Sequence, residues 1–97
     1  MTNYAAGRRL EYLARDELRR QGYVVIRSAG SKTPIDLVAL NDREVLVIQV
    51  KKDAGDVKAA IASLAALVLL VGVRREVWMR ERGVWRIAEV CPARVQH

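Results

Sequence analysis

The sequence predicts an α/β fold in which a mixed central β-sheet is flanked by helices. Helical and strand patterns follow one another along the chain as a helix, three strands, a second helix and then two or three strands. A mixed sheet with helices against it is the natural way to bury that order of elements. The 97 residues, 52% of them apolar, support one core and leave no room for a second. We therefore expect residues 1–97 to form a single domain.

The segment from Asn3 to Gln21 is predicted to be an amphipathic helix. Gly22 is expected to end it. Most of its arginines fall outside the apolar stripe, whereas Glu11 lies beside the stripe, so we expect Glu11 at the boundary between helix and core. The residues that form the stripe at helical spacing are Ala6, Leu10, Leu13, Ala14 and Leu18.

Three strands are expected after this helix. Tyr23 to Arg27 is rich in β-branched residues, and a loop of sequence SAGSKTP follows it. Ile35 to Leu40 and Glu44 to Lys51 then read as the two strands of a hairpin, connected by a polar turn.

Polar side chains inside this hairpin indicate its register. With Asp42 and Arg43 as a two-residue loop, Asp36 stands directly opposite Gln49. Lys51 comes two residues after Gln49 and therefore points to the same face. A three-residue loop would turn Asp36 to the wrong face, so the polar cluster favours the shorter loop, or a register with a bulge.

The second half of the chain is predicted to contain a helix and further strands. Asp56 to about Leu67 has helical composition with Asp56 as N-cap, and Val68 to Val73 is expected to be a buried strand. Glu76 to Arg80 and Val84 to Val90 read as a second hairpin. The uncharged run from Ala59 to Val73 is shorter than the roughly 20 residues of a transmembrane helix, so we interpret it as core and subunit interface.

Charge and composition favour an anionic partner and exclude several enzyme classes. The chain has 17 Lys and Arg against 11 Asp and Glu, a net charge of +6, and most of the cations are arginine. Arginine binds phosphate bidentately, so nucleic acid is the first candidate and an acidic membrane surface the second. The single cysteine, Cys91, and the absence of a secretory signal pattern predict a reduced, cytoplasmic protein. His97 is the only histidine, which excludes histidine metal sites and Ser/His/Asp triads.

The cluster of Asp36, Gln49 and Lys51 predicts a metal-dependent site. Burying an unpaired charge costs several kcal/mol, so something must compensate these side chains. Mg²⁺ is commonly held by one or two carboxylates together with water and substrate phosphate. A neighbouring lysine can orient water or stabilise charge on a phosphate under attack.

These residues carry a resemblance to a known superfamily. The order of Glu11, a PID motif ending at Asp36 and a QVK motif ending at Lys51 resembles the PD-(D/E)xK nucleases. Within that superfamily, Gly7 to Lys52 is similar to the archaeal-type Holliday junction resolvases, which also occur in phages. The shared features include GRRLEYLARDELRRQGYVVIR and a loop that contains Ser31; the second half matches only in its order of elements. The resemblance implies a restriction-endonuclease-like core.

The resemblance also implies an activity and a set of site residues. It implies a homodimeric DNA endonuclease that cuts two opposing strands of a four-way (Holliday) junction by phosphodiester hydrolysis with Mg²⁺, for which Mn²⁺ can substitute. Such an enzyme works on branched DNA in the cytoplasm, or in the host cytoplasm where a phage encodes it, and has no membrane partner. The implied catalytic residues are Glu11, Ser31, Asp36, Gln49 and Lys51, with Glu11, Asp36 and Gln49 as metal ligands. The implied DNA contacts are Arg8, Arg9, Arg27, Ser31, Lys32 and Lys52.

Gln49 departs from the family pattern, which usually has Glu at this position. An amide oxygen can bind a metal but brings no negative charge, and one charge at about 4 Å contributes on the order of 4 kcal/mol at an effective dielectric of about 20. We therefore expect weaker metal binding or slower turnover. Gln49 is either a natural ligand or an engineered replacement for Glu. Two alternative functions stay open: another PD-(D/E)xK repair or replication nuclease, and a branched-DNA-binding module with a vestigial site.

Simpler interpretations exist for several of these residues. Glu11 could pair with Arg15 or Arg8 on the helix surface, a contact that contributes only a few tenths of a kcal/mol. Lys51 could be a solvated strand end. Trp78 and Trp85 lie on adjacent predicted strands, where a cross-strand pair in the core or an interface is commoner than stacking on bases.

Overall fold

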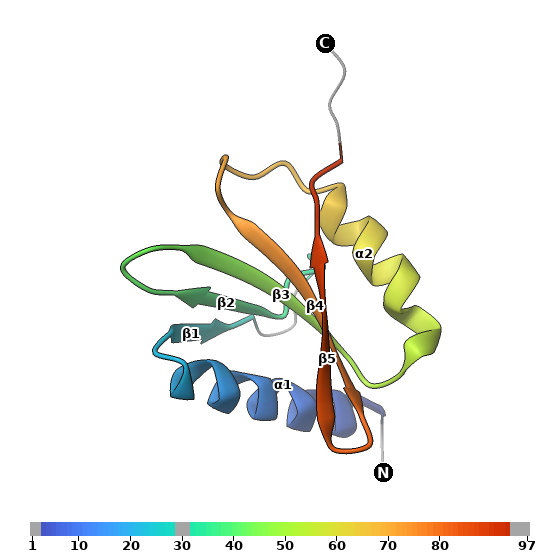
Figure 1. Ribbon diagram of the computed structural model, residues 1–97. Helices are drawn as coiled ribbons and strands as arrows, with labels where there is room; N and C mark the ends of the chain where they lie inside the picture. The colour runs from blue at the N-terminus through green and yellow to red at the C-terminus, as the bar shows by residue number, and fades with distance from the viewer. Residues whose placement is uncertain (1–2, 29–31, 94–97) are drawn as a thin grey trace.

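The computed structural model describes residues 3–28 and 32–93, and its five strands form one mixed sheet (Figure 1). The strands lie in the sheet in chain order, and only the pair of β3 and β4 is parallel. The predicted α/β fold with a mixed central sheet is therefore confirmed. The elements are α1 (Asn3–Arg20), β1 (Val24–Arg27), β2 (Leu37–Leu40), β3 (Val45–Lys51), a 3-10 turn (Ala54–Asp56), α2 (Val57–Ala65), β4 (Arg74–Glu81) and β5 (Val84–Val90).

Alternation along the strands separates two hydrophobic clusters. One cluster packs against α1, whose buried residues Ala14 and Leu18 confirm the core-facing part of the predicted stripe, whereas Leu13 is exposed. Leu46 and Ile48 of β3 belong to this cluster because alternate residues of a strand share a face. The second cluster packs against α2 and comprises Ala60, Leu64, Val77 and Val90.

Gly22 ends α1 as the sequence predicts. It has a φ of +95°, a conformation that glycine adopts without steric cost. Its N–H donates to Arg19 O, and the N–H of Tyr23 donates to Leu18 O, so two carbonyls at the helix end are satisfied. The chain thereby reverses directly into β1, which places the α1 residues over the first three strands (Figure 1).

The hairpin of β2 and β3 has the predicted register. Leu40 pairs with Val45, and Leu37 pairs with Ile48. The side chain of Asn41 stabilises the turn, since its Oδ1 accepts the backbone N–H groups of Arg43 and Glu44 at 2.9 Å. The turn therefore has the predicted two-residue loop, Asp42 and Arg43.

Val68 to Val73 is not the buried strand that the sequence predicted. Residues 66–73 form an irregular connection from α2 to β4, in which the exposed fractions of Val68 and Leu70 are 89% and 84%. The run joins neither open edge of the sheet, β1 or β5, and β4, which follows it, is paired with β3 and β5. The β3 to β4 connection has to return along the sheet, and this loop does so after α2.

The ends of α2 also differ from the prediction. Asp56 precedes the helix but makes no side-chain capping bond; Asp53 instead accepts the N–H of Gly55 at 3.0 Å and caps the 3-10 turn. At the other end, Nη1 of the buried Arg75 donates to the carbonyls of Leu64, Ala65 and Leu67. None of the helices in the described part of the chain has the length and apolar content that crossing a membrane requires.

The two tryptophans confirm the core interpretation. Trp78 is buried, and its ring centroid lies 5.3 Å from that of Trp85 on the neighbouring strand. The indole N–H of Trp78 donates to Glu76 Oε1 at 2.9 Å, so its polar atom is satisfied inside the core. Trp78 therefore supports β4 beneath α1 and is not a surface for bases.

Candidate active site

Asp36 lies directly before β2 and is held against β3 by two hydrogen bonds. Its backbone N–H donates to Ile48 O at 2.9 Å, and its carboxylate Oδ2 accepts the N–H of Val50 at 2.8 Å. The register of the hairpin ends with Leu37 opposite Ile48, and Asp36 also donates to Ile48 O, so two consecutive residues stand against Ile48 as in a β-bulge, next to the part of β3 that carries Gln49. On the other side, the N–H of Ser28 donates to Asp36 O at 2.9 Å, which ties the end of β1 to the same point.

Gln49 contributes an unusual oxygen to this region. Its Oε1 is buried and has no hydrogen-bond partner among the described residues. Leaving a buried acceptor unpaired costs about 1–3 kcal/mol, so such an atom calls for a ligand. A cation bound beside Asp36 would satisfy it.

Glu11 pairs with Arg27 and not with the helix neighbours that the simpler interpretation proposed. Arg27 Nε donates to Glu11 Oε1 at 2.9 Å, and both side chains are largely shielded from solvent. Arg15 instead forms two hydrogen bonds with Asp16, at 3.1 and 3.0 Å. The contact joins the middle of α1 to the end of β1, so it connects the helix to the sheet next to Asp36.

Electrostatics couple these groups into one cluster. Burial raises the pKa of the Asp36 carboxyl above its ordinary value, while the N–H of Val50 and the charges of Lys51 and Arg27 partly oppose that rise. Burial also raises the pKa of Glu11; the Asp36 charge adds to the effect, and Arg27 opposes it. Glu11, Arg27, Asp36 and Lys51, which we call the charged cluster, therefore lie within electrostatic reach of one another.

The predicted metal ligands contain two carboxylates and one amide. Across residues 3–28 and 32–93, no group of three or more His, Cys, Asp or Glu side chains is placed to hold a metal ion. Carboxylate and amide oxygens are nevertheless the donors that Mg²⁺ and similar cations prefer. The buried, unpartnered Oε1 of Gln49, on the strand that also binds the Asp36 carboxylate through Val50, fits such a cation, with one negative charge fewer than a glutamate would supply.

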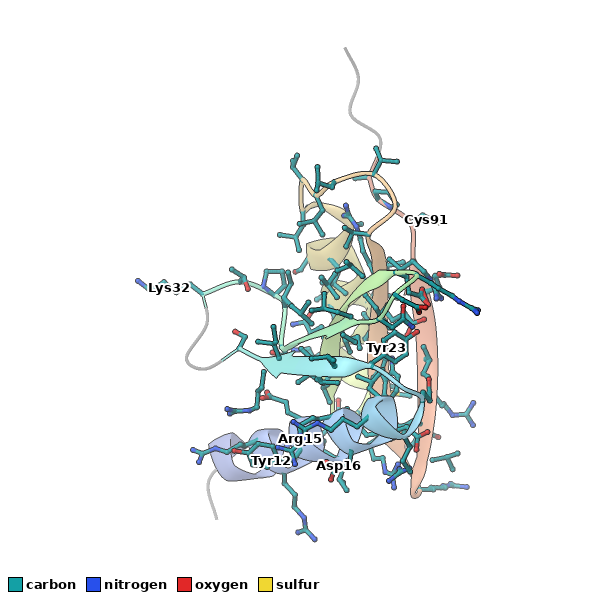
Figure 2. All side chains as sticks on the ribbon, turned by 90° about the vertical axis from the view of Figure 1, so that its left-hand side faces the viewer. Tyr12, Arg15, Asp16, Tyr23, Lys32 and Cys91 are labelled. Atoms are coloured by element: carbon teal, nitrogen blue, oxygen red, sulfur yellow. The ribbon has the colours of Figure 1, made fainter. Side chains whose placement is uncertain are left out.

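The predicted DNA contacts are spread around the charged cluster. Arg8 and Arg9 are exposed on α1, and the charge of Arg8 acts on Glu11. Lys52 is exposed immediately after Lys51, and Figure 2 shows Lys32 extending from the loop between β1 and β2. Ser31, predicted as both a catalytic and a DNA-binding residue, lies outside the described residues.

Sequence reasoning missed one residue of this region, Tyr12. The guanidinium carbon of Arg27 lies 5.1 Å from the centre of the Tyr12 ring, and that of Arg15 lies 4.8 Å from it. Figure 2 shows Tyr12 and Arg15 together on α1. The signal was present in the helical spacing, since Tyr12 follows Glu11 and precedes Arg15 by three residues, but Arg27 could not be placed without the tertiary fold.

A mixed sheet with Asp36 before one strand and a Gln-x-Lys motif ending at Lys51 on the next defines a nuclease of the PD-(D/E)xK class. Residues 2–76 match the family model of the archaeal Holliday junction resolvase (Hjc), so the chain belongs to that family. It is accordingly a junction-resolving nuclease, a crossover junction endodeoxyribonuclease. The family implies a divalent metal ion as cofactor and branched DNA as substrate.

A solved structure supports the same assignment. Hjc of Archaeoglobus fulgidus, a Holliday junction resolvase from an archaeal hyperthermophile, is similar to this chain with a TM-score of 0.64 and 29% sequence identity. The similarity covers 84% of this chain and 74% of that chain. Comparison with curated proteins gives no match.

Proposed function

We propose that the whole chain acts as a single nuclease domain and resolves four-way DNA junctions with Mg²⁺, for which Mn²⁺ can substitute. We further propose that it works as a homodimer in the cytoplasm, or in the host cytoplasm if a phage encodes it. The observation that carries the proposal is the pair of oxygens on facing strands: Asp36, oriented by the N–H of Val50, and the buried, unpartnered Oε1 of Gln49.

Asp36 and Gln49 would hold the metal ion, with Glu11 as the third ligand. When bound, the ion supplies positive charge that stabilises the phosphate oxygens and acidifies water. Glu11 would orient the attacking water and accept its proton. The ammonium group of Lys51 would stabilise the negative charge that develops as the water oxygen bonds to phosphorus and the bond to the leaving oxygen breaks.

The cationic side chains around this site would hold the DNA backbone. Arg27 and Ser31 would contact the scissile phosphate or its neighbours, since Arg27 ends β1 next to Asp36. Contacts to flanking phosphates are assigned to Arg8, Arg9, Lys32 and Lys52, which are all exposed. Such contacts position the protein on DNA without reading its sequence, as selectivity for shape requires.

Exposed apolar residues support the homodimer. Val24 of β1, Leu40 of β2 and Val45 of β3 are register partners across the sheet, and Val45 lines the same groove as Leu70 and Val71. We call Val24, Ile26, Val45, Leu70 and Val71 the apolar surface. All five are exposed, and such a contiguous patch is typical of an interaction site. A homodimer covers the patch with its own copy, and it supplies the two nuclease sites that two strands require.

Cleavage of a labelled four-way junction in Mg²⁺ tests the proposal. The chain as it stands is compared with Gln49→Glu and with Asp36→Asn, and a linear duplex of the same sequence serves as control. We expect cleavage of the junction in preference to the duplex, at least as fast in Gln49→Glu, and none in Asp36→Asn despite retained binding. Cleavage that persists in Asp36→Asn would refute the assigned site.

A second candidate function follows from Gln49. A branched-DNA-binding protein with a vestigial site would bind the junction with steep salt dependence. It would yield no metal-dependent product even after Gln49→Glu. Binding without cleavage in both proteins would therefore replace the nuclease proposal with this one.

A further inference from the structure

Tyr12 lies between the charged cluster and the exposed side of α1. Its ring is 38% exposed, yet two guanidinium groups lie against it, those of Arg27 and Arg15. A cation over an aromatic ring contributes about 0.5–1 kcal/mol at exposed sites and more when shielded from water. The two contacts therefore restrain both the ring and the arginines.

Arg27 has two restraints of different kinds. Its Nε donates to Glu11 at 2.9 Å, while its guanidinium carbon lies 5.1 Å from the Tyr12 ring centre. The first restraint uses a carboxylate that the nuclease proposal assigns to the metal. The second uses no carboxylate and therefore does not depend on the partner of Glu11.

We infer that Tyr12 is a positioning residue that keeps Arg27 at the site when a DNA phosphate and the metal ion separate it from Glu11. In the free protein, Arg27 neutralises Glu11. In the complex, a phosphate oxygen replaces the Glu11 carboxylate as the acceptor for the guanidinium, which stays stacked on Tyr12. The inference rests on the proposed function, because Arg27 is assigned there to the scissile phosphate.

Arg15 has a supporting part in this arrangement. Its own charge is paired with Asp16, so its contact with Tyr12 fixes the ring without drawing Arg27 away. Tyr12, Arg15 and Asp16 lie together on α1 in Figure 2. No atom of Tyr12 is required to touch the reacting phosphate.

Matched substitutions separate the aromatic face of Tyr12 from its hydroxyl and its bulk. Tyr12→Phe keeps the ring, whereas Tyr12→Leu keeps apolar bulk and removes the ring. With Ca²⁺ in place of Mg²⁺, so that a metal ion is bound but cleavage is suppressed, and at fixed salt, we expect Tyr12→Leu to raise the junction Kd about three- to tenfold, and Tyr12→Phe to change it less than about twofold. Because Tyr12 is partly exposed, both variants should remain folded.

A double-mutant cycle tests whether Tyr12 acts through Arg27. Arg27→Gln removes the cation from the ring, so adding Tyr12→Leu to it should weaken binding less than about twofold further. Additive effects would overturn the inference. So would equal loss in Tyr12→Phe and Tyr12→Leu, which would point to a direct hydroxyl contact.

A readout in the free protein keeps this test separate from the nuclease proposal. The Nε–H resonance of Arg27 should shift in Tyr12→Leu and stay near its original position in Tyr12→Phe, because the ring current is lost only in the first. An unchanged resonance in Tyr12→Leu would refute the contact itself. Loss of junction preference in the unmodified chain would instead refute the proposed function, while the resonance would still decide whether Tyr12 holds Arg27.

Discussion

The backbone N–H of Val50 donates to Asp36 Oδ2 at 2.8 Å, so the strand that carries Gln49 and Lys51 also orients the carboxylate opposite them. The donor is a backbone group of β3 and not a side chain that could rotate away. It does not remove the cost of burial, because the pKa of Asp36 stays above its ordinary value of 3.8. The buried charge of Asp36 therefore lowers the stability of the metal-free fold.

Asp36→Asn should therefore stabilise the metal-free protein near neutral pH. A carboxyl whose pKa is raised by folding contributes stability below its ordinary pKa and loses that contribution as pH rises through the folded-state value. Asparagine can still accept the N–H of Val50 but carries no charge. We expect a higher Tm than that of the unchanged chain at pH 7, measured with EDTA. The gain should vanish at a pH below 3.8, and a lower Tm at pH 7 would contradict the argument.

Gln49→Glu should have the opposite effect on the metal-free protein. It adds a buried negative charge opposite Asp36, so Tm at pH 7 should fall in EDTA and recover as the pH is lowered. Added Mn²⁺ should raise Tm more in this variant than in the unchanged chain, with an affinity at least about tenfold higher. Gln21→Glu makes the same change at an exposed turn residue just after α1 and should leave the metal response unaltered. An equal response to Mn²⁺ in both variants would argue against Gln49 as a ligand.

Arg75→Met should destabilise the fold without touching the site. Nη1 of Arg75 satisfies three carbonyl groups at the end of α2, and the loss of these bonds from a buried position should cost about 2–3 kcal/mol. Urea unfolding at pH 7 measures the change. Arg43→Met, on the exposed turn between β2 and β3, is the matched control and should change stability by less than about 0.5 kcal/mol. Equal losses of unfolding free energy in the two variants would show that the hydrogen bonds of Arg75 add no stability beyond that of an exposed arginine.

Leu70→Glu should dissociate the proposed homodimer. Leu70 is 84% exposed, so the charge should leave the monomer folded but repel its counterpart when two apolar surfaces meet. Sedimentation equilibrium at micromolar concentration should give a dimer for the unchanged chain and a monomer for the variant. Val84→Glu, on β5 and outside the apolar surface, should remain dimeric. A monomeric mass for the unchanged chain would rule out the dimer.

The first three strands could be predicted because each carries its own local signal. The alternation of apolar residues and the polar cluster specified a register that the structure confirms from Leu37 to Leu40, whereas Asp36 departs from it by donating to Ile48 O. The prediction of a strand at Val68 to Val73 failed for the opposite reason: the composition is that of a buried strand, but these residues join neither β1 nor β5 at the edges of the sheet. Composition does not record which segments the tertiary fold brings to a strand edge.

The partner of Glu11 could not be predicted for a related reason. Within the helix, Arg8 and Arg15 were the neighbours that spacing offered, whereas the actual partner, Arg27, comes from the next element. Predicting this pair requires knowing how α1 lies against β1. That arrangement follows the turn at Gly22, and the periodicity of the sequence does not reveal it. For the same reason, the sequence alone could not show that Tyr12 contacts Arg27. The residue types could thus identify the candidate site, but only the fold shows which of its charged side chains form pairs.

The parallel pairing of β3 with β4 has a consequence for synthesis of the protein. The residues assigned to catalysis lie between Glu11 and Lys51, so the ribosome releases all of them early. β3 is a central strand, however, and half of its backbone groups wait for Arg74–Glu81, which emerges only after the loop of residues 66–73. Until then the nascent chain presents an open strand edge, the kind of edge that aggregates. β3, which carries Gln49 and Lys51, therefore lacks one of its two sheet partners until Arg74–Glu81 has left the ribosome.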